Sequence, residues 1–201
     1  MTVKVSHITH VDNLAGILRE GCLWSDAKRI ALNLNNKNIG YNHIKQRRLQ
    51  HSVNVAAGGT IGEYVPFNFC PRSVMLYVIH QGHDDFHDGQ DNIVHLISDV
   101  PTITAINPNC FFPDIHADLA FAEQIDDFSR LDELDFQKIR AKYWQQFKEE
   151  KQAEFLAHES VPWNCLRQIG VKTPELADTV KQIIALSQHQ PDVLVKPEWY
   201  Y

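Results

Sequence analysis

The alternation of apolar and polar positions predicts short strands along much of the chain. Residues 3–8 and 64–69 alternate over strand length, and residues 154–161 form an apolar, β-branched run that Pro162 ends. Pro66 has no amide hydrogen for a strand ladder, so we expect the strand at 64–69 to lie at a sheet edge or a bulge. Further apolar runs predict strands at 74–80, at 93–97, at 102–106, from Val171 and at 192–195.

Apolar residues at helical spacing predict a small number of helices. Asp12 or Asn13 can cap a first helix, and Gly21 stands just beyond its end. An irregular polar segment should follow it, at 23–38. Further helices are expected over 41–49, 123–148 and 174–186. Because the chain has no internal repeat, linker or low-complexity stretch, the pattern predicts one mixed α+β domain over residues 1–201.

The charge of the chain is unevenly distributed. Its 201 residues carry a net charge of −6, which by itself argues against a nucleic-acid partner. Residues 28–48 nevertheless hold six basic residues and no acid, whereas acidic residues gather at 84–91 and 123–135. A basic face on an acidic protein is therefore compatible with the sequence, and the net charge does not decide the partner.

Cysteine spacing and apolar runs indicate the compartment. The four cysteines are far apart and form no CxxC pair, which favours reduced thiols in a cytosolic protein over a zinc ribbon. No apolar run approaches the roughly 18 residues that a membrane helix needs. The first residues lack the apolar core of a secretion signal, so we expect a cytoplasmic protein with no membrane partner.

Three polar clusters are candidates for ligand contacts. Glu154 stands at the start of a predicted strand, where a carboxylate can reach a ligand, although a solvated Glu at a strand end is the more ordinary interpretation. His7 and His10 end the first strand, and Arg47 and Arg48 point to different faces of a short helix. From the residues alone, the histidines can equally be ordinary strand-end residues, and the arginines a solvated helix face.

The run from His83 to Asp88 combines two histidines with three aspartates and invites a metal interpretation. Its spacing matches none of the common zinc or calcium sites. We therefore interpret the run as an acidic surface turn and expect no metal ligand in the protein.

Five separated segments give the sequence a resemblance to a known family. They are HITHVDNLAGILREG, IGYNHIKQRR, GGTIGEYVPFNFCPRSVMLY, KQAEFLAHESVPW and KPEWYY. In this order, and over nearly the whole chain, they resemble DarT-type DNA ADP-ribosyltransferases, the toxins of bacterial toxin–antitoxin pairs. The resemblance implies an ADP-ribosyltransferase fold, with two packed, mostly antiparallel sheets and flanking helices around a cleft for NAD. It also implies transfer of ADP-ribose from NAD to a base in single-stranded DNA with loss of nicotinamide, and a macrodomain ADP-ribosyl hydrolase as antitoxin.

The resemblance also implies roles for individual residues. Glu154 and Arg48 match catalytic positions. The residues expected to bind NAD are His7, Thr9, Asn13, Gly16, Leu23, Arg48 and Phe67. The residues expected to bind DNA are Lys45, Arg47, Arg72 and Met75. The chemistry is consistent with these roles, because a carboxylate can stabilise an oxocarbenium-like ribose and a guanidinium offers a fixed fork for phosphate or base oxygens.

The DNA surface itself is expected over 24–48, where basic residues alternate with Trp24 and Tyr41 as in strand-binding surfaces. The Asn-rich residues 33–38 could read base edges there.

Two positions depart from the family pattern. Asn68 stands where the family usually has Tyr, which removes an aromatic contact, and Ala157 stands where the family often has Val. Two other functions stay open. One is an ADP-ribosyltransferase that modifies protein or RNA, because surface loops choose the acceptor. The other is an inactive NAD-binding domain, which the presence of Glu154 disfavours.

Overall fold

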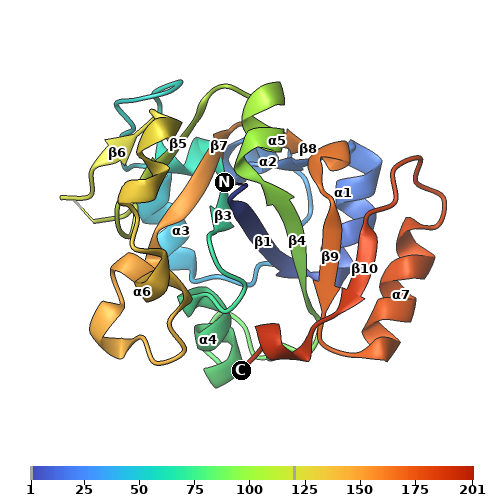
Figure 1. Cartoon of the computed structure of the whole chain (residues 1–201). Coiled ribbons are helices and arrows are strands. Elements are labelled where there is room, and N and C mark those ends of the chain that lie inside the picture. Colours follow the sequence, from blue (N-terminus) through green and yellow to red (C-terminus); the bar gives the residue numbers. More distant parts are fainter. Residues whose placement is uncertain (1, 120) are drawn as a thin grey trace.

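The computed structural model describes residues 2–119 and 121–201 and has a mixed α+β architecture (Figure 1). Its strands are β1 (Lys4–His10), β2 (Cys22–Trp24), β3 (Tyr64–Asn68), β4 (Ile93–Asp99), β5 (Cys110–Pro113), β6 (Gln124–Ile125), β7 (Glu154–His158), β8 (Ser160–Pro162), β9 (Gln168–Val171) and β10 (Asp192–Val195). Its α-helices are α1 (Leu14–Glu20), α2 (Asp26–Ala31), α3 (Asn42–Arg48), α4 (Val74–Gln81), α5 (Val100–Ile106), α6 (Phe136–Arg140) and α7 (Pro174–Ile184). The α+β class expected from the sequence is confirmed.

One large sheet has the strand order β10-β9-β4-β1-β3-β7-β5-β6, and β2 and β8 form a small second sheet. All strand pairs are antiparallel except β9 with β10. The large sheet divides between β1 and β3, which share only the register pair Ser6 and Asn68. Pro66 explains the division, because it has no amide hydrogen to donate to β1 and its carbonyl accepts a side-chain hydrogen bond from His7 instead. Because β3 lies between β1 and β7, the expectation of an edge position is wrong, and its continuous register with β7 shows no bulge on that side.

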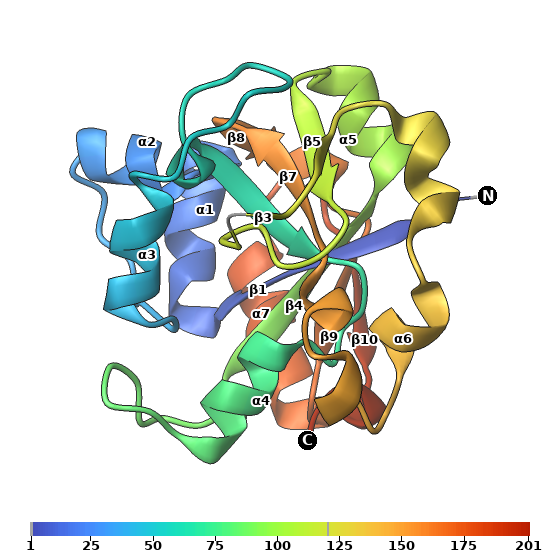
Figure 2. The same ribbon diagram turned by 90° about the vertical axis from the view of Figure 1, so that its left-hand side faces the viewer.

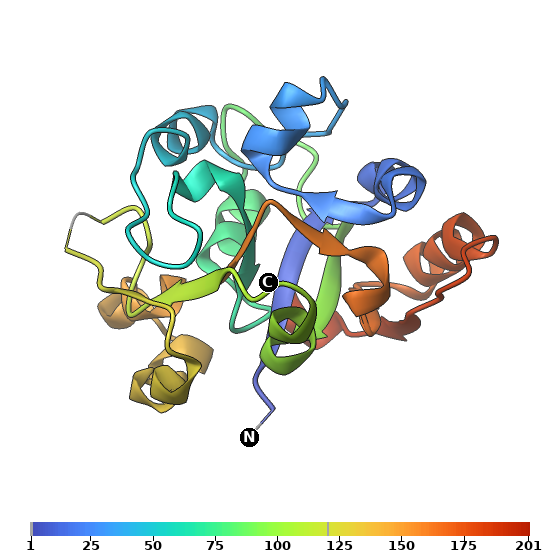
Figure 3. The ribbon, with the colours of Figure 1, turned by 90° about the horizontal axis from the view of Figure 1, so that it is seen from above.

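The helices are distributed unevenly around this sheet. In Figure 2, α1, α2 and α3 gather on one side of the molecule, and Figure 3 shows the same grouping from above. Helix α7 lies beyond β10 at one end of the sheet, and α6 lies at the other end. The main core contains fully buried side chains from both halves of the sheet, such as Leu96 of β4 and Phe155 of β7.

Two predicted strands are helices. Residues 74–80 belong to α4, where the Ser73 hydroxyl caps the first turn by accepting from the Leu76 amide. Residues 102–106 belong to α5, where Asp99 accepts from the Thr102 amide and Pro101 occupies the first turn. Short apolar runs do not distinguish a buried strand from a buried helix, and in both cases the capping residue decided the outcome.

The long helix predicted over 123–148 is also wrong. The segment contains β6, the short α6 and 3₁₀ turns at Phe128–Glu133 and Gln145–Phe147. Asp127 and Asp135 each cap a new turn by accepting backbone amides, which interrupts any continuous helix. The strand predicted over 154–161 is divided into β7 and β8 by Glu159, whose φ of 59° turns the chain.

Several other elements agree closely with the sequence pattern. The first strand, the α1 helix and its left-handed Gly21, the helix near Arg48, and the strand at 93–97 are all present. The α7 helix begins at Pro174 as predicted and ends at Ile184.

Candidate functional site

The two predicted catalytic residues contact each other although 106 positions separate them. Arg48 ends α3, and Glu154 begins β7, where it pairs with Asn68 of β3. The Nη1 and Nη2 atoms of Arg48 donate to Oε1 and Oε2 of Glu154 at 2.7 and 3.1 Å. The two side chains are largely buried, with exposed fractions of 15% and 9%. A guanidinium and a carboxylate joined by two parallel hydrogen bonds form one of the strongest charged contacts in proteins.

Burial and the neighbouring charge act on Arg48 in opposite directions. Burial by itself lowers the pKa of Arg48, but Glu154, together with Asp26 and Asp118, offsets this effect, so that the pKa is raised overall. Arg48 therefore remains a cation at every working pH and fixes the orientation of the carboxylate.

This ion pair lines a cavity of about 310 Å³, a size typical of small-molecule sites. The cavity lies along the division between β1 and β3 and is enclosed by α1, α2, α3, α4 and the loop between α2 and α3. The residues predicted to bind NAD or DNA that line it are His7, Thr9, Asn13, Gly16, Leu23, Lys45, Arg48 and Met75. Residues from widely separated motifs thus meet in one cavity.

Three residues predicted to contact ligands do not line this cavity. Phe67 is fully buried, and its ring packs against His7 and Phe155, so its position favours support of His7 over direct contact with NAD. Arg47 turns away and forms an ion pair with Asp118. The guanidinium of Arg72 lies 4.3 Å from the ring centre of Tyr201.

His7 presents a defined tautomer to the cavity. Its Nδ1 lies 2.8 Å from the carbonyl oxygen of Pro66, which can only accept, so Nδ1 carries the hydrogen. Burial lowers the pKa of His7. The ring is therefore neutral near pH 7, and its Nε2 is an acceptor suited to a hydroxyl group.

The basic residues of 28–48 do not form an open cationic face. They bind acids outside residues 28–48, of which Asp26 is a neighbour on the same helix and the others are more distant in sequence, in the ion pairs Lys28–Glu159, Arg29–Asp26, Lys37–Asp12, Lys37–Asp88, Lys45–Asp26, Arg47–Asp118 and Arg48–Glu154. Several of these contacts lie at the cavity, where Asp26 receives both Lys45 and Arg29. These ion pairs occupy the cations of the DNA surface expected over 24–48, and that surface stays a prediction.

The sequence interpretation missed several cavity residues. His116 lines the cavity and pairs with Ala153, next to Glu154. Burial lowers the pKa of His116, opposed by Glu154. Nothing in the surrounding sequence forms a recognisable motif, so only the fold could identify it. Trp24 and Arg29, which were expected on the DNA surface, also line the cavity, and their Nε1 and Nε atoms are buried donors with no partner among the described residues.

The His83–Asp88 turn has a structural role instead of forming a ligand cluster. Asp85 accepts from Asn42, Asp88 binds Lys37, and His83 contacts the carbonyl of Ile39. Over the described ranges, no three histidine, cysteine or acidic side chains converge as a metal site would require. Each helix in those ranges is too short or too polar to cross a bilayer.

Comparison with protein families gives a match over residues 6–201. The matching profile describes "ssDNA thymidine ADP-ribosyltransferase, DarT". Among curated proteins, a DNA ADP-ribosyl transferase of Thermus sp. strain 2.9 is 36% identical over 98% of this chain and 95% of its own length. A DNA ADP-ribosyl transferase of Thermus aquaticus is 38% identical over 98% of this chain and 88% of its own length.

Comparison with solved structures gives the same result. Thermus sp. 2.9 DarT in complex with ADP-ribosylated ssDNA has a TM-score of 0.93 and 35% identity, covering 99% of this chain and 96% of that one. The same protein in complex with NAD⁺ has a TM-score of 0.88 and 33% identity, covering 99% and 98%.

Proposed function

The chain belongs to the DarT family of single-stranded-DNA ADP-ribosyltransferases, and from this membership we propose how its own residues carry out the reaction. The protein is an NAD-dependent transferase that attaches ADP-ribose to a base of single-stranded DNA. The finer assignment, thymidine as the acceptor, follows the family description. The observation that carries the proposal is the Arg48–Glu154 fork in the wall of a cavity of about 310 Å³.

The cavity is suited to a dinucleotide. Arg29 and Lys45 line the cavity, and their cationic groups suit the phosphate oxygens of such a ligand. Neutral His7 offers an acceptor to a ribose hydroxyl. When bound, NAD supplies the ADP-ribosyl group, its bond to nicotinamide breaking with the electron pair leaving on nicotinamide while a base nitrogen bonds to the ribose carbon.

Glu154 has two roles in this proposal. As an anion it stabilises positive charge that develops on the ribose, and as a base it accepts the proton that the acceptor nitrogen releases. Arg48 holds both carboxylate oxygens, so that Glu154 keeps one orientation in the absence of substrate. Each oxygen has a further lone pair with which to accept the proton.

The path of the DNA strand is proposed from the cations that the fold leaves unpaired. Arg140, Lys142 and Lys148 are exposed and, among the described residues, form no ion pair. Tyr143, with 78% of its surface exposed, stands among them and could stack on a base. Lys151 ties this segment to the start of β7, because its Nζ donates to the carbonyls of Ile139 and Ala141.

These cations support a strand that runs from the cavity past Met75 toward residues 140–148. In the same proposal, Arg72 lies beside the strand, whereas Lys45 and Arg47 are occupied by Asp26 and Asp118. Their predicted contact with DNA would require those ion pairs to open.

The direct test is incubation with NAD and defined oligonucleotides, with products identified by mass. We expect ADP-ribose on thymidine of single strands, with little on the duplex, where extruding a base costs a few kcal/mol. Glu154→Gln should lose at least 10²-fold in turnover, as expected for loss of a general base. Glu159→Gln is the matched control, because that carboxylate is exposed and bound to Lys28.

Other acceptors are outcomes of the same experiment. Matching RNA and total cell protein are supplied in parallel, each with and without EDTA. ADP-ribose found chiefly on RNA or protein would replace the DNA assignment, and activity lost with EDTA would show a metal requirement. Near-normal turnover of Glu154→Gln would remove the catalytic assignment.

We further propose that residues 1–201 work as one catalytic domain in the cytoplasm, as the toxin of a toxin–antitoxin pair. The proposed antitoxin is a macrodomain ADP-ribosyl hydrolase, which would remove the modification from DNA. Co-expression of a neighbouring macrodomain gene should restore growth to cells that express the chain, and a hydrolase-dead version should not.

A further inference from the structure

Residues 34–41, which we call the cavity loop, connect α2 to α3 and line the cavity along most of their length. Asn33, immediately before the cavity loop, lies in the left-handed backbone region, with φ of 53°. In the part of the chain that the structure describes, residues 35–40 make no backbone-to-backbone hydrogen bond. The loop is therefore held in place by side chains.

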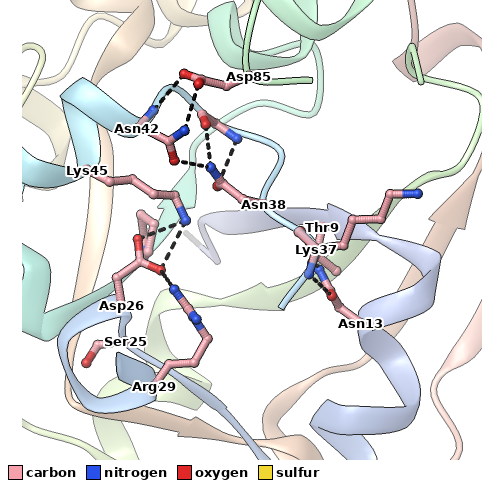
Figure 4. Close-up of polar contacts among 12 residues, drawn as sticks. Thr9, Asn13, Ser25, Asp26, Arg29, Lys37, Asn38, Asn42, Lys45 and Asp85 are labelled. Carbon is pink, nitrogen blue, oxygen red and sulfur yellow. Dashed lines mark hydrogen bonds and ion pairs between the residues drawn. The ribbon is translucent and has the colours of Figure 1, made fainter. Parts of the chain in front are cut away.

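Asn13 provides the most complete of these contacts. Its Oδ1 accepts from the Lys37 amide at 2.8 Å, and its Nδ2 donates to the Lys37 carbonyl at 3.0 Å and to the Thr9 hydroxyl at 2.9 Å. Figure 4 shows Asn13 between Thr9 of β1 and the loop backbone. The backbone N–H and C=O of Lys37 fix the orientation of the Asn13 side-chain amide. If its oxygen and nitrogen were interchanged, the oxygen would face the Lys37 carbonyl oxygen.

These three contacts use most of what the Asn13 amide can offer. Both Nδ2 hydrogens have acceptors, and Oδ1 already receives one amide. The side chain lines the cavity, yet its hydrogen-bonding groups are directed at the protein itself. A direct contact with a ligand would have to displace one of these bonds.

Further contacts hold the far end of the loop. Asn42 gives its backbone and side-chain amides to Asp85, at 2.9 and 2.6 Å, and Asn38 donates to the Asn42 side chain at 2.9 Å. The Lys37 side chain turns outward to exposed Asp12 and Asp88. Exposed ion pairs contribute little to stability, so the Asn13 contact restrains Lys37 more effectively than these ion pairs do. The neighbouring Ile39 is held separately, by burial in the core and by His83 at its carbonyl.

We propose that Asn13 is a positioning residue for NAD binding, whose amide holds the cavity loop at the Lys37 backbone so that the cavity is formed before NAD arrives. This proposal rests on the proposed function in taking NAD as the ligand. This role differs from the one that the family resemblance implies for Asn13, which is direct contact with NAD. A preformed loop removes an ordering cost from binding, so loss of Asn13 should appear in the affinity for NAD.

The test compares Asn13→Ala and Asn13→Asp with Asp88→Asn, a control that removes a surface partner of Lys37 and leaves the Asn13 contact intact. Amide hydrogen exchange is measured by mass spectrometry without NAD, and kcat and KM for NAD are measured with one oligonucleotide. Asn13→Ala should speed exchange by about tenfold at the loop amides that donate hydrogen bonds, those of Leu34, Lys37 and Gly40, and should raise KM by a similar factor, with kcat changed less than about threefold. Asn13→Asp keeps the acceptor for the Lys37 amide but places a carboxylate oxygen against the Lys37 carbonyl, so it should change both quantities at least as much as Asn13→Ala. Asp88→Asn should change both quantities less than about twofold.

Three results would overturn the proposal. A raised KM with unchanged exchange in the loop would mean that Asn13 binds NAD directly. A lowered kcat with unchanged KM would place its effect in the chemical step. Exchange raised equally in α7, far from the loop, would mean that Asn13 supports the whole fold. If the wild-type chain transfers no ADP-ribose, the proposed function fails, while the exchange measurement still decides whether Asn13 holds the loop.

Discussion

Replacing Arg48 alone should destabilise the fold more than replacing both members of the Arg48–Glu154 pair. The pair is nearly buried and joined by two hydrogen bonds of 2.7 and 3.1 Å. Two unit charges about 4 Å apart attract each other by about 4 kcal/mol at an effective dielectric constant of about 20. Removing both from water costs a similar amount, so the intact pair contributes little net stability compared with two apolar side chains.

Arg48→Met leaves the Glu154 carboxylate buried without its cation, which should cost about 3–5 kcal/mol. Glu154→Leu should cost less, because Arg48 is also attracted by Asp26 and Asp118. The double variant Arg48→Met/Glu154→Leu has no buried charge to compensate, and its stability should lie within about 1–2 kcal/mol of the wild type.

Urea unfolding of the four proteins measures the coupling energy between the two side chains. The Lys138–Glu150 pair is a suitable control, because its contact is 2.7 Å long but its side chains are 37% and 31% exposed. That control pair should show a coupling below about 1 kcal/mol. If the double variant is as unstable as Arg48→Met, the two charges do not compensate each other, and the reasoning about the site's electrostatics is refuted.

Three further predictions concern other parts of the molecule. Burial lowers the pKa of His95 from 6.5 to about 3. The free energy of unfolding should therefore be complete above pH 6.5 and fall as the pH drops toward 3, by about 2 kcal/mol at pH 5. The variant His95→Phe should not show this fall, and equal pH profiles of the two proteins in urea unfolding would contradict the prediction. Gly170→Ala places a methyl group 2.3 Å from the Trp199 ring and should lower the free energy of unfolding by about 1–3 kcal/mol. Gly16→Ala meets no atom within 4 Å and should stabilise α1 by about 0.5–1 kcal/mol in thermal unfolding. If Gly16 contacts the ligand, the same variant should raise KM for NAD. The double variant Lys142→Ala/Lys148→Ala should reduce the slope of log affinity for the oligonucleotide against log salt by the amount expected for about two lost phosphate contacts. Lys181→Ala on α7 should leave this slope unchanged. Equal slopes for the double variant and the wild type would rule out the proposed strand path.

The parts of the fold that the sequence could predict are those with their own local signals. Helix α1 ends at Gly21 because glycine tolerates a φ of 71°, and α7 begins at Pro174 because proline is compatible with a first helical turn. The apolar runs of helices α4 and α5 suit strands equally well, so hydrophobic pattern alone does not identify these two helices. Greater weight on Ser73 and on Asp99 with Pro101 as capping signals would have corrected both.

The candidate site was predictable in its residues but not in its geometry. The family resemblance selected Glu154 and Arg48, and the fold brings them within hydrogen-bond distance through the pairing of β3 with β7. His116 could not be found in this way, because it belongs to no quoted motif and reaches the cavity only by pairing with Ala153. Phe67 belongs to a matching motif but is buried against His7, which favours a supporting position in the core over contact with the ligand.

The segment 28–48 illustrates why local charge is a poor guide to a binding surface. It contains no acid, so the sequence suggests a cationic face, but the fold brings acids to it from β7, from the turn after α4 and from the segment around Asp118. Each of these acids lies far away in sequence and comes close only when the cavity is assembled. The same charges that would attract DNA in an isolated peptide therefore hold α3 and the cavity loop against the rest of the protein. Cations that the fold leaves unpaired are better placed to attract DNA, and the proposed strand path uses the group of them at residues 140–148.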